Sequence, residues 1–217
     1  MNKLAAVLAL SFAGAAWGQT GELWFNFGWS IMGNNGIGSP LAFGGSPSDV
    51  KLDDGYRFSF RFGFNQGDHF GHEIQYAFNH TQFDESANAC GATIGAGTGI
   101  GTPTGGVNPC KMAMHFHQGG YNFLYYFTTD RTRIRPFATA GVGFNDFIPP
   151  GGAVNYGSQD EFGFNAGAGV KFHIHGMWAG RVDVREYTMP KPNFGYLYGA
   201  TGWLLQTEAS AGVGIGF

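Results

Sequence analysis

Apolar and polar side chains alternate along most of this chain. Near its start, one set of alternate positions is apolar: Leu23, Phe25, Phe27, Trp29 and Ile31. The segment GYRFSFRFGFNQ (residues 55–66) likewise places five aromatic side chains on one face and mainly Arg, Ser, Gly and Asn on the other. Successive side chains of a β-strand point to opposite faces, so a period of two predicts strands that separate two different surroundings.

Eight segments have this pattern. They are residues 23–31, 55–66, 70–80, 120–127, 134–144, 162–172, 178–187 and the C-terminal stretch that ends at Phe217. Short turns are expected at 66–68, 128–133 and 173–177, and long connections at 33–54, 84–113, 146–159 and 188–201. Strict alternation of short and long connections is typical of an up-and-down barrel that carries its loops at one end.

The apolar face is suited to lipid. It is almost continuously aromatic, whereas the opposite face carries Gly, Ser, Asn and single charges that are too sparse to solvate a surface. Each segment has about ten residues, enough for a tilted strand to cross a bilayer. Since lipid cannot satisfy backbone groups, such strands must close on themselves. The sequence therefore predicts an all-β, eight-stranded antiparallel up-and-down transmembrane β-barrel; the alternative is a soluble exported barrel of the lipocalin type.

Residues 1–18 have the features of a secretory signal peptide. Lys3 precedes an apolar run from Leu4 to Ala16, and small residues precede a cleavage position after Gly18. The run is too short to span a membrane as a helix. We expect residues 19–217 to form one barrel domain with four long extracellular loops. The alternative for the first residues is an N-terminal helix retained in the fold.

Composition agrees with an exported membrane protein. Charged residues make up 12% of the chain, about half the usual fraction. The formal net charge is −3 and the basic residues are scattered, so no nucleic-acid partner is expected. Cys90 and Cys110 fit one disulfide in an oxidising compartment, with two free thiols as the alternative. Such a bridge would stabilise the fold by about 3 kcal/mol.

Four motifs carry a resemblance to a known family: RPFATAGVGF (135–144), FGFNAGAGVKF (162–172), RVDVREY (181–187) and SAGVGIGF (210–217). They resemble the eight-stranded outer-membrane β-barrels, a family that includes the outer membrane protein A and X barrels and the opacity proteins. The resemblance implies the outer membrane of a diderm bacterium. The terminal Phe217, with Ile215 and Val213 before it, is similar to the signal read by the outer-membrane assembly machinery. Expected partners are therefore outer-membrane lipid, that machinery and an extracellular ligand bound by the loops; we expect a monomer without a cofactor.

Eight charged residues fall on the inward face of the predicted strands. They are Arg57, Arg61, Glu73, Lys171, Arg181, Asp183, Arg185 and Glu208. We expect Arg185 and Glu208 at similar depth on neighbouring strands, and Arg61 and Glu73 at similar depth across a hairpin. An eight-stranded barrel is just wide enough for side chains to fill, and buried charges need partners. The prediction is a salt-bridged network that closes the lumen; the alternative is a narrow ion path gated by exchange of ion-pair partners.

Histidines and carboxylates at the loop-bearing rim raise the question of a metal. His115 and His117 share a strand face, and His80 lies at the same rim near Asp84 and Glu85. Their spacing is not diagnostic of a zinc or copper site, so we predict no metal.

One strand position is also irregular. Glu186 points outward by strict alternation, so either the strand has left the lipid there or a bulge shifts its register.

Catalysis is not predicted. A barrel that modifies lipid A needs a membrane-facing nucleophile beside an oriented base, and the strands have no His-x-Ser motif and no outward Ser. We therefore expect a non-enzymatic protein of membrane integrity or surface interaction that acts through its loops, above all residues 84–113 and 188–201. The Gly/Thr-rich tract 91–109 and the aromatic stretch 193–203 are candidate contact surfaces. The ion-conducting pore is the first alternative and the lipid A-modifying enzyme the second.

Overall fold

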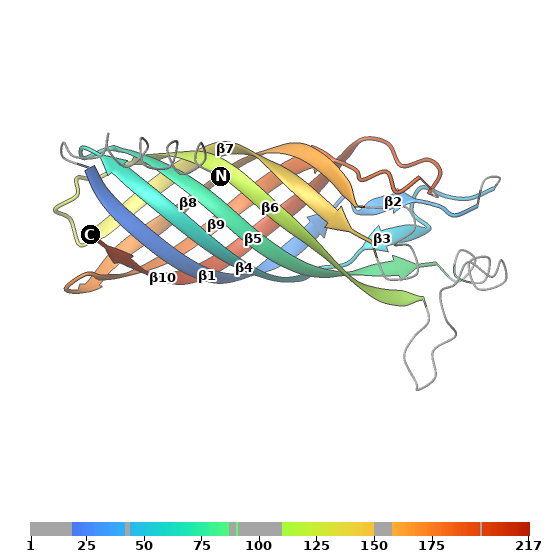
Figure 1. The fold of residues 1–217 in the computed structure, drawn as a ribbon, viewed down its shortest axis with the longest axis horizontal. Coiled ribbons are helices and arrows are strands. Elements are labelled where there is room, and N and C mark those ends of the chain that lie inside the picture. The colour runs from blue at the N-terminus through green and yellow to red at the C-terminus, as the bar shows by residue number, and fades with distance from the viewer. Residues whose placement is uncertain (1–18, 42–43, 87–89, 91–109, 150–157, 196) are drawn as a thin grey trace, which may run out of the picture.

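The computed structural model describes residues 19–41, 44–86, 90, 110–149, 158–195 and 197–217. Eight long antiparallel strands curve around a common axis (Figure 1). They are β1 (Gln19–Gly33), β4 (Gly55–Gln66), β5 (Phe70–Glu85), β6 (Lys111–Tyr126), β7 (Ile134–Ile148), β8 (Gln159–His175), β9 (Trp178–Pro190) and β10 (Trp203–Gly216). Two short strands, β2 (Gly36–Gly38) and β3 (Val50–Leu52), lie in the connection between β1 and β4, where the sequence predicts only a loop.

The sheet closes into a barrel. Each long strand pairs with the next one along the chain, and β10 returns to pair with β1, from Glu22 opposite Gly216 to Gly33 opposite Leu205. No long strand is left with a free edge among the described residues, as a lipid environment requires. The predicted eight-stranded antiparallel barrel is confirmed.

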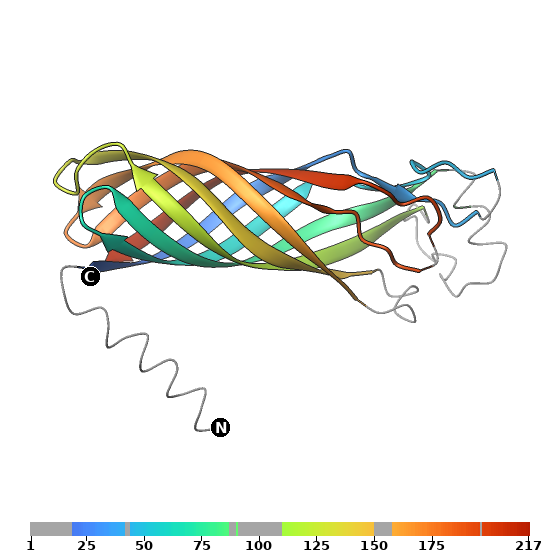
Figure 2. The same cartoon turned by 90° about the horizontal axis from the view of Figure 1, so that it is seen from above.

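The two ends of the barrel differ, as the connection lengths predict. The three short turns and the C-terminus lie at one end, called the turn end below (Figures 1 and 2). The described parts of the long connections, with β2 and β3, lie at the other, the loop end. Gly67 and Gly176 have positive φ angles of 64° and 59° in two of the short turns, a conformation that glycine adopts without a steric cost.

Strand β6 is longer than the sequence pattern predicts. It begins at Lys111, and the predicted segment 120–127 covers only its turn-end half. In the loop-end half, inward Met114 and Phe116 alternate with outward His115 and His117. Apolar side chains therefore no longer mark the outward face there. Pairing with β5 nevertheless continues up to Asp84 opposite Lys111.

The outer surface of the barrel is apolar. Rings on neighbouring strands pack against one another across it, as in Phe25 with Phe60 at 5.3 Å and Phe27 with Phe58 at 5.2 Å between ring centroids. An apolar band of this kind is what hydrocarbon chains contact in a transmembrane barrel. Among the described residues, no helix has the length and apolar character needed to cross a membrane.

Glu186 faces outward without a bulge. It lies opposite Thr207 in an uninterrupted β9–β10 register, and the Thr207 hydroxyl donates a hydrogen bond of 2.5 Å to its carboxylate. Of the two alternatives for this position, the bulge is therefore wrong. The alternation is kept, and the outward carboxylate is satisfied by the neighbouring strand.

Candidate functional site: the filled lumen

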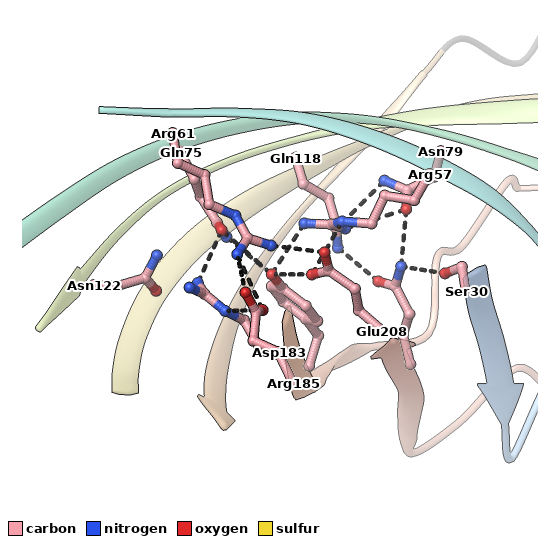
Figure 3. A network of polar contacts seen from close by, with 12 residues as sticks. Ser30, Arg57, Arg61, Gln75, Asn79, Gln118, Asn122, Asp183, Arg185 and Glu208 are labelled. Atoms are coloured by element: carbon pink, nitrogen blue, oxygen red, sulfur yellow. Dashed lines mark hydrogen bonds and ion pairs between the residues drawn. The ribbon is translucent and has the colours of Figure 1, made fainter. Parts of the chain in front are cut away.

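The middle of the lumen is occupied by an ionic network. Strand β4 contributes Arg57 and Arg61, β5 contributes Glu73, and β10 contributes Glu208; the rest comes from β9, with Arg181, Asp183 and Arg185. These seven side chains are among the most buried in the protein, although all are charged. Figure 3 shows how several of them converge from opposite walls of the barrel.

Asp183 is the most heavily contacted carboxylate. Nη1 of Arg61 donates to both of its oxygens, at 3.0 and 2.9 Å. Nε of Arg181 donates to Oδ2 at 2.6 Å, and Nε of Arg185 donates to Oδ1 at 3.1 Å. Three guanidinium groups thus share one carboxylate. Such charge-assisted bonds are stronger than neutral ones and offset part of the cost of burying the charges.

The other two carboxylates complete the network. Glu73 accepts from Arg181 at 2.5 Å and from Arg185 at 2.8 Å. Glu208 accepts from Arg61 at 2.6 Å and from the hydroxyl of Tyr187 at 2.9 Å, and it lies 3.2 Å from Nε of Arg57. Every arginine of this set therefore contacts at least one carboxylate.

The ion pairs of this network do not join neighbouring strands: five run across the lumen between β4 or β5 and β9 or β10, and two hold Asp183 to Arg181 and Arg185 of its own strand. Arg185 and Glu208 do lie opposite each other in the β9–β10 pairing, at the expected equal depth. However, the carboxylates bound by Arg185 belong to Glu73 and Asp183, and those bound by Arg61 belong to Asp183 and Glu208. The bore is narrow compared with an arginine side chain, so the guanidinium groups reach the far wall. Glycines make room for them: a Cβ on Gly167 would lie 2.8 Å from Cγ of Arg185.

A neutral network continues toward the loop end. Arg57 donates to Asn79 at 3.1 Å and to Gln118. Gln206 in turn donates to Asn79 at 2.9 Å and to Ser30 at 2.5 Å. The inward polar side chains therefore link Arg57 to strands β1, β5, β6 and β10, which restricts its rotamer.

The turn end of the lumen is closed by a cation among aromatic rings. Lys171 pairs with Glu22, and its Nζ lies 2.6 Å from the Tyr126 hydroxyl and 5.3 Å from the ring centre of Trp24. Glu22 also accepts from the indole N–H of Trp24 at 2.9 Å. Glu22 is missing from the predicted charge set. Extending the alternation of positions 24, 26 and 28 by one step toward the N-terminus would have found it.

The loop end is closed by a hydrophobic cluster. Its buried members are Met32, Ile37, Val50, Leu52, Phe83, Met114, Phe116, Phe147, Tyr187, Met189, Phe194, Leu197 and Leu204. Phe194 and Leu197 come from the β9–β10 connection, which is tied to the β1–β4 connection by paired backbone bonds between Ser39 and Tyr198. The aromatic stretch 193–203 is therefore only partly a contact surface, because Phe194 and Leu197 point inward, while Tyr198 is 54% exposed.

The predicted disulfide joins Cys90 and Cys110, with a Cα–Cα distance of 5.3 Å. The bridge lies beside the loop ends of β5 and β6, where the backbone N–H of Glu85 donates to the carbonyl of Cys110. Residues 91–109, the Gly/Thr-rich tract between the two cysteines, lie outside the described residues.

The rim histidines face outward. His80 lies opposite His115, with ring centroids 6.0 Å apart, and the Tyr56 ring stacks on His80 at 4.8 Å. His117 makes a hydrogen bond of 2.6 Å with the hydroxyl of Tyr76. Within the part of the chain that the structure describes, no group of three or more His, Cys, Asp or Glu side chains is arranged to hold a metal ion.

Serines in the described strands do not face the lipid. Ser30, Ser59 and Ser210 all point into the lumen and are buried. The membrane-facing nucleophile that a lipid A-modifying barrel requires is therefore not found on these strands.

A closed eight-stranded barrel with an apolar outer surface and a lumen filled with side chains defines a transmembrane β-barrel. A family model described as "Outer membrane protein beta-barrel domain" matches residues 4–217, and the chain belongs to this family. It is thus an outer-membrane protein of a diderm bacterium, as predicted. The soluble barrel of the lipocalin type is excluded by this membership.

Solved structures with the same fold cover nearly the whole chain. The outer membrane protein OprG from Pseudomonas aeruginosa is 13% identical over 92% of this chain and 96% of its own, with a TM-score of 0.56. AlkL, solved in lipid bilayers, is 13% identical over 91% and 90%, with a TM-score of 0.51. Neisserial surface protein A is 14% identical over 90% and 96%, with a TM-score of 0.50. No curated protein sequence matches the chain.

Proposed function

We propose that this protein is a non-conducting, non-enzymatic outer-membrane scaffold that maintains membrane integrity or mediates surface interaction. Its loop end faces the exterior of the cell, the usual orientation of long loops in outer-membrane barrels. The single observation that carries the proposal is the filling of the lumen: a hydrophobic cluster, an ionic network and a lysine among aromatic rings follow one another along the axis. The mature protein begins at residue 19, after removal of a signal peptide, and it is a monomer.

The three layers argue against the pore. Exchange of ion-pair partners in the middle layer would rearrange guanidinium groups that already contact two carboxylates each, as Arg61 and Arg185 do. It would not remove the hydrophobic cluster at the loop end, where an ion would lose its hydration without gaining polar contacts. A conducting state therefore requires two independent rearrangements.

The recognition surface is assigned to the loop end. Tyr198 and Trp203 are exposed there, and Lys111 bridges Asp53 at 2.9 Å and Asp84 at 3.2 Å on its surface. The Cys90–Cys110 bridge holds the two ends of the tract 91–109 together. The tract can therefore be exchanged without altering the strands that carry it.

Single-channel recording tests the closed lumen. The refolded mature protein, with folding verified by its mobility on an unheated gel, is placed in a planar bilayer beside Glu208→Ala. We expect no current from the wild type. A steady wild-type current whose size changes in Glu208→Ala would overturn the proposal and establish a pore whose conductance depends on the charge network.

Exchange of the tract tests recognition. Cells that display the protein with residues 91–109 replaced by a short Gly/Ser linker, with both cysteines kept, should lose adhesion to host cells or matrix. The matched control replaces residues 150–157 in the same way. Adhesion that survives replacement of residues 91–109, or that is lost equally in the control, would refute the assignment to this tract. A changed lipid A mass on overexpression would point to the enzyme instead.

A further inference from the structure

The turn end of the barrel contains a cavity of about 190 Å³. Its wall includes the charged side chains of Glu22, Asp130, Arg133, Arg135 and Lys171. The three cations exceed the two carboxylates by one formal charge. Lys171 and Glu22 neutralise each other in a direct ion pair, so the excess positive charge rests on the two arginines.

Arg135 is the unusual member of this set. It is only 9% exposed, and its guanidinium lies 3.8 Å from the ring centre of Tyr126. Nη2 donates to the backbone carbonyl of Asp68 at 2.9 Å, whereas the buried Nε has no hydrogen-bond partner in the described part of the chain. No described carboxylate lies within ion-pair distance of it, unlike the four arginines of the central network.

A buried guanidinium without a counter-ion is costly, because burial removes its hydration and no attraction compensates. A planar guanidinium with free N–H groups also matches the paired oxygens of phosphate or carboxylate. Arg133, exposed on the rim of the same cavity, adds a second positive charge. Arg135 is therefore suited to bind an oxyanion that enters the cavity.

The surroundings of the cavity indicate where that oxyanion comes from. Phe172 and Met177 also line it: Phe172 is 39% exposed on the outward face of β8, and Met177 is 58% exposed in the turn that follows. The cavity is thus polar inside and continuous with the apolar belt outside. We propose that it binds the phosphate group of an anionic phospholipid, with Arg135 as the main contact and the acyl chains against Phe172 and Met177.

Lipid-dependent stability tests the site. The mature protein, Arg135→Gln and the matched control Arg131→Gln, which removes an exposed cation from the turn before β7, are refolded into phosphatidylcholine vesicles with or without phosphatidylglycerol. The urea midpoint is read from gel mobility, and retained lipid is counted by native mass spectrometry. Phosphatidylglycerol should raise the midpoint of the wild type and of Arg131→Gln. Arg135→Gln should retain about tenfold less of the lipid, as expected for loss of a charge-assisted contact.

Several outcomes would overturn the inference. One is an equal response of Arg135→Gln and Arg131→Gln to phosphatidylglycerol, which would reflect general attraction to an anionic surface. Another is a full shift from inorganic phosphate in phosphatidylcholine vesicles, which would assign the site to free phosphate. Arg135→Lys keeps the charge without the planar group and covers the case in which Arg135→Gln does not fold. It should retain an intermediate amount of lipid, and retention equal to the wild type would refute the role of the guanidinium.

Discussion

Replacing Asp183 by Asn is the sharpest test of the central network, because the substitution preserves shape and removes only the charge and two acceptor positions. Asp183 accepts from three guanidinium groups and is 4% exposed. In the variant, the amide oxygen can still accept from two donors. The amide NH₂ would face the N–H groups that Oδ2 accepts now, those of Arg61 and Arg181.

The expected cost follows from these contacts. Two charge-assisted hydrogen bonds at 2.9 and 2.6 Å are lost, and each is worth about 1.5–3 kcal/mol. The central network changes from four arginines against three carboxylates to four against two. Removal of one partner from a buried ion pair costs about 3–5 kcal/mol, and we expect Asp183→Asn to lower the free energy of unfolding by this amount.

Urea unfolding in lipid vesicles measures this loss, with the folded fraction read from gel mobility. The control is the double variant Asp183→Asn with Arg61→Met, which restores the formal charge balance. If the cost comes from unpaired charge, adding Arg61→Met to Asp183→Asn should be much less destabilising than Arg61→Met alone. A loss below about 1 kcal/mol in Asp183→Asn, or strict additivity of the two changes, would refute the reasoning.

Three further outcomes are expected. In the same urea assay, Gly167→Ala should lower the free energy of unfolding by about 1–3 kcal/mol, because its Cβ would lie 2.3 Å from a β9 carbonyl oxygen. Gly63→Ala is the control and should be nearly neutral, since a Cβ there would have no atom closer than 3.5 Å. Phe194→Ala should cost about 3–5 kcal/mol by the same measurement, since it empties part of the loop-end cluster; a neutral result would mean that this cluster does not stabilise the barrel. The backbone N–H of Ser46 donates to the Asp49 carboxylate and holds its pKa below the usual value. This contact therefore contributes its full stability at a pH above the usual pKa of an aspartate, and the contribution is lost as the pH falls through the lowered pKa of Asp49. The protection factors of the β2–β3 amides, which are exchange rates corrected for the intrinsic pH dependence of amide exchange, should fall on acidification in the wild type and stay constant in Asp49→Asn.

The strands and their faces could be predicted because lipid imposes a simple rule on them. Outward positions within the lipid belt must be apolar, so alternation such as Phe58, Phe60 and Phe62 identifies the strand, and the positions between identify the lumen. The same rule located the inward arginines 57 and 61. It became uninformative in the loop-end half of β6, where inward residues form a hydrophobic cluster and outward residues are partly polar.

The pairing of the charges could not be predicted. Alternation gives the face and approximate depth of a residue, but it does not give the stagger of the strands around the barrel or the reach of each arginine across it. Arg61 was therefore expected beside Glu73, whereas its carboxylates come from β9 and β10. The inward turn of Phe194 was missed for a related reason, since an aromatic residue in a long connection has no periodicity to show its direction.

The seam between the first and last strands has a consequence for how the protein enters its membrane. Gly21 and Phe217 exchange two backbone hydrogen bonds, of 2.8 and 2.9 Å, so the ring of strands is complete only when the last segment of the chain has folded. Until then, β1 and β10 each display a row of unpaired N–H and C=O groups that hydrocarbon cannot accommodate. The arginines of β4 would also lack the acidic partners supplied by β9 and β10. A half-inserted barrel is therefore unstable in two ways at once, and burial in the bilayer and closure of the ring must take place together.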